Sequence, residues 1–362
     1  MKKQGYGSTD VKVQMSRRTL LKSAAIAAAA PLLAGRAHAS ERRIVIRTSG
    51  GDLTQSYEEH VVRPFTEKTG IQVTQITSGP TPLNMIKGMV DTKSYSWDMA
   101  EISLLSSLAL SDQYLEPLNI DNDPDIAAVP AHMRTALYIP MYLYASVFAY
   151  REDRLKGDGI PKNWAEFYDI KKFPARRSLR RAALDTFESA LLADGVSGDA
   201  LYPLDGDRAL KKLDTVKNDI AIWWETGSQS THLLASGEVD LIATWSQRVN
   251  TAIKGGTPAK IVWKDGYYAT AGWGILKGAP KADMCREFIK FATNPERQAA
   301  FAVKPSVGPV HPKAFDYIPK EIMASLPTYP ENFQQLIPVD AAFWGKNRSA
   351  LEAKFDAWLL SK

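Results

Sequence analysis

Residues 233–249 (LLASGEVDLIATWSQRV) constrain the fold most, because a helical pattern ends there at Gly237 and a short strand pattern begins. The apolar run 239–243 is too short for a helix and is typical of a strand buried in a sheet with helices on its faces. Trp245 ends this run. Because ligands of open α/β sheets bind beyond the carboxyl ends of strands, Trp245 is a candidate wall of a binding cleft, and the alternative is a cap on the core.

Three strand-loop-helix units follow one another after residue 40, and this repetition predicts a right-handed, parallel α/β sheet. The expected strands cover residues 43–48, 71–76 and 97–102. Loops that follow parallel strands share one sheet edge, so we expect Ser49, Ser78 and Ser103 to face the same crevice.

Two glycines, Gly50 and Gly51, follow the first expected strand. They let the backbone turn sharply, and the next helix begins with free N–H groups that could hold an anionic or carbonyl group of a ligand. An ordinary strand-to-helix turn explains the same residues equally well.

Two long strand-like segments, YIPMYLYASVFAY at 138–150 and ATAGWGIL at 269–276, predict two crossings between lobes. A chain of 362 residues exceeds one ordinary domain, which agrees with a two-lobed α/β protein. We divide the chain into lobe 1 (residues 40–145, with a return segment at 271–312), the main part of lobe 2 (146–270) and C-terminal helices packed on lobe 2 (313–362).

Residues 1–39 have the features of an export signal. The segment SRRTLLK at 16–22 carries a twin arginine, residues 24–34 are Ala-rich, and AHA at 37–39 is a small-x-small cleavage pattern. A basic amphipathic helix would explain the arginines but not the cleavage pattern. We therefore expect a twin-arginine signal peptide, a mature chain that starts at Ser40, and export of the folded protein to the periplasm.

The charge of the chain depends on this leader. Subtracting the seven Lys or Arg and the one Asp of residues 1–39 from totals of 45 and 40 leaves 38 basic and 39 acidic residues, a net charge of −1. The excess of basic residues, which was the main argument for a nucleic-acid partner, therefore belongs to the leader. Cys285 is the only cysteine, so no intrachain disulfide can form, and its distance from the leader argues against a lipid membrane anchor.

Motifs of common catalytic chemistry are missing from the sequence. There is no G-x-S-x-G, HExxH, CxxC, Walker-type loop or GxGxxG, and the four histidines beyond residue 39 are scattered. We expect no catalytic residues, no metal site and no cofactor. What remains is a set of aromatic and acidic residues at expected strand ends, which suits a binding cleft: Trp223, Glu225, Trp245, Tyr268 and Trp273.

Charged residues cluster on both sides of position 182. The basic run 171–181 has acidic counterparts elsewhere, which favours a solvated face over a phosphate site. Asp185 and Glu188 have the spacing of one helix side, so they could neutralise a cation at the lip of a cleft, although exposed surface carboxylates are the commoner arrangement.

Four blocks of sequence resemble the solute-binding proteins of bacterial ABC importers: RPFTEKTGIQV at 63–73, WAEFYD at 164–169, GEVDLIATW at 237–245 and EFIKFATNPERQAAFA at 287–302. The likeness covers nearly the whole chain after the leader and is greatest for the spermidine/putrescine-binding branch. It implies a type II periplasmic-binding-protein-like fold, with a small-molecule ligand held between two α/β lobes and delivered to the transmembrane subunits of an ABC permease. We expect a monomer that binds a small polar or cationic solute, with a polyamine-like ligand as the first candidate.

The resemblance also assigns roles to single residues. Trp245 matches the aromatic residue that packs on the polyamine chain, and Asp185 falls near the acid that receives a ligand ammonium. The chain departs from the branch at Gly50 and Gly51, where polyamine binders carry aromatics, and at 269–271 (ATA), where they carry an acid. Losing a carboxylate there would leave an ammonium unpaired.

Two other functions stay open. The adjacent Tyr267 and Tyr268 suggest a ferric-iron receptor in the same fold, because phenolates are hard oxygen ligands, although neighbouring tyrosines more often pack or line a rim. An exported hydrolase would use Asp185 and Glu225 as acid and base if they faced one another.

Overall fold

The computed structural model describes residues 42–78 and 82–361. The expected signal peptide at 1–39 lies outside the described residues. The description that follows concerns the compact unit Ile44–Lys362, together with Arg43 at the start of its first strand. Its strands are β1 (Arg43–Thr48), β2 (Gln72–Thr77), β3 (Met99–Ser103), β4 (Ile139–Arg151), β5 (Arg177–Arg180), β6 (Ile220–Trp224), β7 (Leu241–Trp245), β8 (Ala259–Ile275), β9 (Gly308–Pro309) and β10 (Ile337–Pro338).

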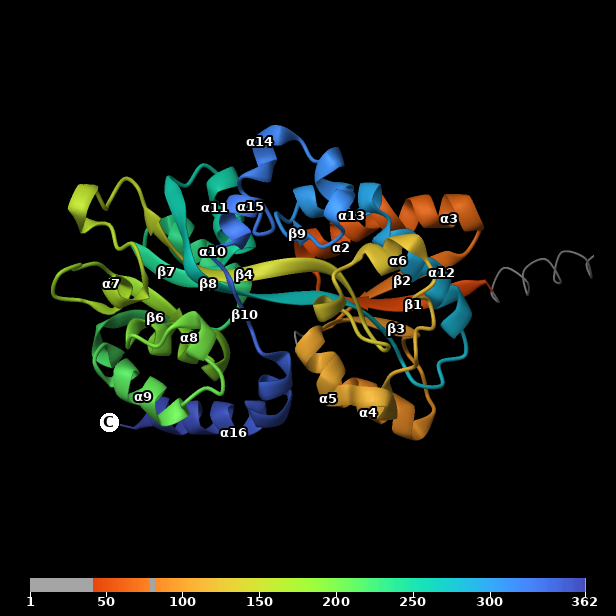
Figure 1. Ribbon diagram of the computed structural model, residues 1–362, viewed down its shortest axis with the longest axis horizontal. Helices are drawn as coiled ribbons and strands as arrows, with labels where there is room; N and C mark the ends of the chain where they lie inside the picture. The colour runs from red at the N-terminus through yellow and green to blue at the C-terminus, as the bar shows by residue number, and fades with distance from the viewer. Residues whose placement is uncertain (1–41, 79–81, 362) are drawn as a thin grey trace, which may run out of the picture. The chain divides into compact units, whose positions relative to one another are not determined.

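Helices lie on both sides of these strands (Figure 1). A π-helical turn, Glu58–Val62, joins the first two helices. The α-helices are α2 (Gly51–Tyr57), α3 (Arg63–Thr69), α4 (Leu83–Thr92), α5 (Leu104–Tyr114), α6 (Pro124–Ala128), α7 (Trp164–Tyr168), α8 (Ala183–Ala193), α9 (Gly206–Asp214), α10 (Gly227–Ser236), α11 (Ser246–Lys254), α12 (Ala282–Thr293), α13 (Pro295–Val303), α14 (Lys320–Met323), α15 (Pro330–Phe333) and α16 (Ala341–Leu360).

In the described part of the chain the strands form one mixed sheet, in the order β2-β1-β3-β8-β4-β7-β5-β6, with β9 on β4 and β10 on β8. β1 and β3 run parallel at one end, and β5 runs parallel to both β6 and β7 at the other. The long strands β4 and β8 pair antiparallel in the middle and connect the two groups. These are the two crossings predicted from the sequence, and the arrangement is the two-lobed α/β fold that was expected.

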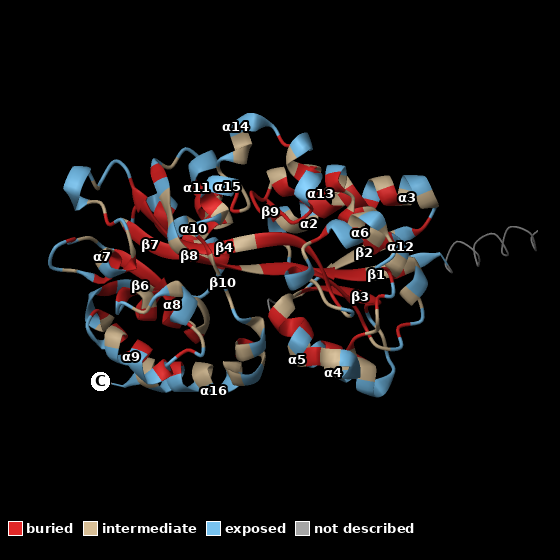
Figure 2. Cartoon of the chain, in the orientation of Figure 1, coloured by how far each residue is buried: buried red, intermediate tan, exposed pale blue. Residues whose placement is uncertain are grey.

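Apolar residues form a separate core at each end of the sheet. The larger cluster surrounds β1, β3 and α12, and includes Tyr57, Trp273 and Phe288. The second surrounds β5, α8 and α16, and includes Phe187, Trp344 and Phe355. Figure 2 shows that β4 and β8 are buried along much of their length, as a pair covered on both faces requires.

Local sequence explains where several elements begin and end. Gly70 and Gly237 end α3 and α10 in the left-handed conformation, with φ of 73° and 74°. Side chains of Ser103, Asp205 and Asp340 accept hydrogen bonds from backbone N–H groups in the first turns of α5, α9 and α16. The C-terminal helix α16 contacts α8 and α9 and also α5 of the first lobe.

Candidate binding cavity

A cavity of about 500 Å³ lies at the strand ends, bordered by residues of both lobes. Its volume falls within the range of small-ligand sites. Seven of the eleven residues predicted for the site line it: Ser49, Ser78, Ser103, Asp185, Glu225, Trp245 and Tyr268.

Gly50 and Gly51 are not among the lining residues. Gly50 has φ of 86° and ψ of 178°, a conformation almost confined to glycine, and its N–H donates to the Thr54 hydroxyl at 3.0 Å. A Cβ at Gly50 would lie 2.8 Å from the Thr77 methyl group. The pair therefore makes the strand-to-helix turn, which was the second of the two explanations considered from the sequence.

Two predicted tryptophans also lie away from the cavity lining. Trp223 packs against Phe355 and Trp358 of α16, since successive residues of β6 face opposite sides of the sheet. Trp273 is 0% exposed and packs between Tyr57 of α2 and Phe288 of α12. Trp273 is a core residue and Trp223 is partly buried, because helices cover the faces of the sheet on which they lie.

The first-lobe wall of the cavity is organised by Arg47, whose guanidinium is buried. It donates to the Ser78 hydroxyl at 3.1 Å, the Ser78 carbonyl at 2.9 Å and the Glu101 carbonyl at 2.8 Å. Glu101 is also buried, and its carboxylate accepts from Ser49 at 2.7 Å and from Tyr142 at 2.8 Å. Burial raises the pKa of Glu101 and lowers that of Arg47.

The second-lobe wall is organised by Asp185, at the start of α8. Its carboxylate accepts from Arg180 at 2.6 Å, from Ser146 at 2.7 Å and from the Trp245 indole N–H at 3.1 Å. The Asp185 carbonyl accepts from the Tyr267 hydroxyl. The acid predicted to receive a ligand ammonium is thus already paired with a cation of the protein.

Trp245 is partly buried at the end of β7 and faces the cavity. The Arg180 guanidinium lies 5.0 Å from its ring centroid, a cation–π distance, and the Trp224 ring meets it edge-on at 5.3 Å. Tyr144 contacts it from the first crossing strand at 6.4 Å. Trp245 is therefore fixed on several sides and still contributes to the cavity surface.

Arg248, in the first turn of α11, also lines the cavity. None of the hydrogen bonds or ion pairs within the described ranges involves its guanidinium, and its Nε is buried without a partner. Burial lowers its pKa. The close approach depends on Gly227, where a Cβ would lie 2.4 Å from the Arg248 Nε. A desolvated guanidinium without a protein anion is suited to a ligand carboxylate.

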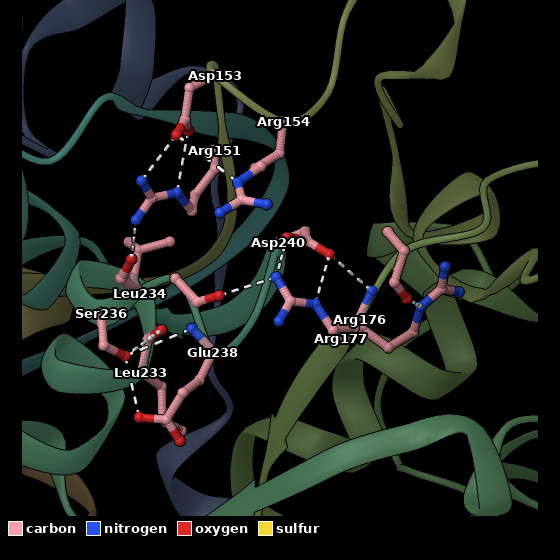
Figure 3. Close-up of polar contacts among 12 residues, drawn as sticks. Arg151, Asp153, Arg154, Arg176, Arg177, Leu233, Leu234, Ser236, Glu238 and Asp240 are labelled. Carbon is pink, nitrogen blue, oxygen red and sulfur yellow. Dashed lines mark hydrogen bonds and ion pairs between the residues drawn. The ribbon is translucent and has the colours of Figure 1, made fainter.

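The basic run 171–181 was predicted to be a solvated face, and Lys171, Lys172, Arg176 and Arg181 are exposed, whereas Arg177 is buried and Arg180 is partly buried. Arg176 forms a two-pronged contact with Asp240 of the GEVD segment (Figure 3). Arg177 donates to backbone carbonyls of Phe167 and Phe173. Arg177 is 1% exposed and lies on β5, a strand that was not predicted because its sequence, RSLR, is polar. These contacts leave no free cluster for a phosphate there.

Geometry gives little support to the iron and hydrolase alternatives. Tyr267 and Tyr268 both line the cavity, and the Tyr267 hydroxyl donates to the backbone carbonyl of Asp185. Among the described residues, no group of three or more His, Cys, Asp or Glu side chains could hold a metal. Glu225 pairs with Arg181 at 3.1 Å, so the two proposed catalytic carboxylates have different cationic partners.

Several lining residues were missed from the sequence: Arg47, Glu101, Tyr142, Arg180, Arg248 and Arg348. The signal for Arg248 was its position three residues after Trp245, at the N-terminal end of the following helix. Arg47 interrupts an otherwise apolar strand, which was a further signal, since a buried arginine needs partners.

Comparisons with known proteins agree with this description. Residues 60–332 match the family of bacterial extracellular solute-binding proteins. A gamma-aminobutyric acid-binding protein of Pseudomonas aeruginosa is 34% identical over 333 residues, covering 90% of this chain and 93% of that protein.

Two solved structures have the same fold. An ABC transporter substrate-binding protein from Bradyrhizobium japonicum USDA 110 has a TM-score of 0.83 and 34% identity, covering 87% of this chain and 99% of its own. The PBP MotA from A. tumefaciens B6, in complex with glucopine, has a TM-score of 0.78 and 29% identity, covering 88% and 100%.

No helix among the described residues has the length and apolar character needed to cross a membrane. The family match spans more than half of the chain, and the curated relative covers most of it. The chain belongs to the bacterial extracellular solute-binding protein family, and it is a solute-binding receptor of an ABC transporter.

Proposed function

We propose that this receptor binds a small solute that carries a carboxylate together with an amino group, in the manner of gamma-aminobutyric acid or an opine. The observation that carries the proposal is the Arg248 guanidinium, which lines the cavity without an anionic partner. The names of the relatives support the same class, since gamma-aminobutyric acid and glucopine both contain a carboxylate.

The charges around the cavity favour this class over a polyamine. Four arginines line it against three carboxylates: Arg47, Arg180, Arg248 and Arg348, with Glu101, Asp185 and Glu225. The Asp185 carboxylate is paired with Arg180, so a polyamine would have to displace a partly buried cation to use it. The polyamine-like ligand predicted from the sequence is therefore the second candidate.

The remaining predictions are part of the same proposal. A signal peptide at residues 1–39 would send the folded monomer to the periplasm by the twin-arginine route, where it would deliver solute to the permease. The two lobes would close on the ligand, with boundaries at 40–145, 146–270 and 271–312, and with 313–362 on the second lobe. Hinge closure of this kind commits the solute to the site.

Isothermal titration of the chain from Ser40 tests the ligand class. Gamma-aminobutyrate and an opine should bind, and putrescine, which has no carboxylate, should bind at least about tenfold more weakly. Arg248→Gln should weaken the carboxylate ligands by about 10–100-fold, because a charged hydrogen bond is lost. Arg208→Gln, which changes an arginine that pairs with Asp194 on the surface, is the matched control.

Two outcomes contradict the proposal. Tighter binding of putrescine than of any carboxylate solute would favour the polyamine ligand. Equal affinities of the Arg248→Gln and Arg208→Gln variants for gamma-aminobutyrate would remove Arg248 from the site.

A further inference from the structure

Asp185 has an unusual backbone conformation, with φ of 78° and ψ of −36° inside α8. A residue with a Cβ persists in such a conformation only when its surroundings fix it. Its carbonyl is held by Tyr267 and its carboxylate by three donors, as described above. The remaining backbone group, the Asp185 N–H, donates to the Glu188 carboxylate at 2.9 Å.

Glu188 is 0% exposed and does not line the cavity. Its carboxylate also accepts from the Tyr202 hydroxyl at 2.8 Å and from the Trp344 indole N–H at 2.6 Å. These two donors come from the segment before α9 and from α16, so they fix the carboxylate from outside α8. Burial raises the pKa of Glu188 to about 7, and the three donors hold its oxygens in place.

We propose that Glu188 is a positioning residue of the binding cavity: with Trp344 and Tyr202 it holds Asp185 in its left-handed conformation. Asp185 in turn orients the Trp245 indole and the Arg180 guanidinium at the cavity wall. The C-terminal helix α16 thereby acts on the site indirectly through Trp344, in addition to supplying Arg348 to the lining. The effect of Glu188 on ligand affinity rests on the proposed ligand class, whereas its effect on the geometry of Trp245 does not.

Two substitutions perturb this network and one serves as a control. Glu188→Gln preserves volume but replaces an acceptor oxygen by a donor, so at least one of the three hydrogen bonds must break. Trp344→Phe removes the indole N–H. Trp358→Phe is the matched control, because the Trp358 indole on the same helix donates to a carboxylate, that of Asp214, at the exposed end at 2.7 Å.

The first measurement needs no ligand. The indole ¹H–¹⁵N resonance of Trp245, assigned with Trp245→Phe, reports its hydrogen bond to Asp185 in the ligand-free protein. We expect it to shift in Glu188→Gln and Trp344→Phe and to remain in place in Trp358→Phe. The first two variants should also bind gamma-aminobutyrate about tenfold more weakly, a change of about 1.4 kcal/mol.

An unchanged Trp245 resonance in both Glu188→Gln and Trp344→Phe would overturn the inference. If the unsubstituted protein binds no carboxylate solute, the proposed ligand class fails and the resonance still decides this inference. Should Glu188→Gln not fold, Tyr202→Phe, which deletes a single hydroxyl, provides the same test.

Discussion

Breaking the Arg180–Asp185 ion pair at the cavity wall is expected to destabilise the fold strongly. The two charged groups approach to 2.6 Å, and the side chains are only 17% and 12% exposed. Replacing Arg180 with Met leaves the Asp185 carboxylate in a poorly solvated position with two neutral donors, Ser146 and Trp245. Removing one member of a buried pair is costly because the other charge remains without its partner.

The size of the effect follows from this geometry. Unit charges about 4 Å apart interact by about 4 kcal/mol at an effective dielectric constant of about 20. Because the cavity admits solvent, we expect Arg180→Met to cost about 3 kcal/mol, the lower end of the range for a broken buried pair. A double-mutant cycle with Asp185→Asn should give a coupling energy of about 2–3 kcal/mol, since the double variant has no unpaired charge.

Urea unfolding of the ligand-free protein, followed by tryptophan fluorescence at physiological salt, measures this coupling. The control cycle uses Arg208 and Asp194, a pair of nearly the same length, 2.7 Å, whose side chains are 47% and 38% exposed. The exposed pair should couple by about 0.2–1 kcal/mol. Equal coupling energies for the two pairs would refute the view that burial at the cavity wall strengthens the Arg180–Asp185 interaction.

Two further predictions concern the turn after β1 and the buried acid of α8. Gly50→Ala should destabilise the protein by about 1–3 kcal/mol because its backbone conformation excludes a Cβ. Gly51 has φ of 60° and open space around it, so Gly51→Ala should lower the stability less in the same thermal melts. Equal losses of stability would contradict a steric clash between a Cβ at position 50 and Thr77. Burial raises the pKa of Glu188 from 4.5 to about 7, so its stabilising contribution is complete below about pH 4.5 and is lost as the pH rises through 7. Urea unfolding measures the loss of stability between pH 4.5 and pH 8. This loss should be about 3 kcal/mol larger in the unsubstituted protein than in Glu188→Gln. Equal losses in the two proteins would contradict the raised pKa of Glu188.

The sequence predicted the fold well where apolar periodicity was strong. The first crossing strand, expected at 138–150, is β4, and the strand expected at 43–48 is β1. The second crossing was expected only at 269–276, whereas β8 begins at Ala259. The strand continues through a bulge, in which Asp265 has φ of 56° and the register against β4 shifts between Ser146 and Phe148.

The site was harder to predict, because strand-end position does not determine which face a side chain occupies. Trp223 lies one residue before the end of β6 and Trp245 ends β7, but only Trp245 faces the cavity, since Trp223 is covered by α16. That helix is distant in sequence, so no local pattern near Trp223 could reveal the contact. β5 was missed for a related reason: Arg177 and Arg180 are charged residues whose partners, backbone carbonyls and Asp185, come from other segments.

The GEVDLIATW segment shows how one block can identify a family without identifying a ligand. Gly237 ends α10, Asp240 anchors Arg176, and Leu241 and Ile242 are fully buried in β7. These residues maintain the fold, and Trp245 alone of the block contributes to the cavity lining. An aromatic face accepts many solutes, so selectivity must come from charges outside the block. The unpaired guanidinium of Arg248 therefore says more about the ligand than the block that identified the family.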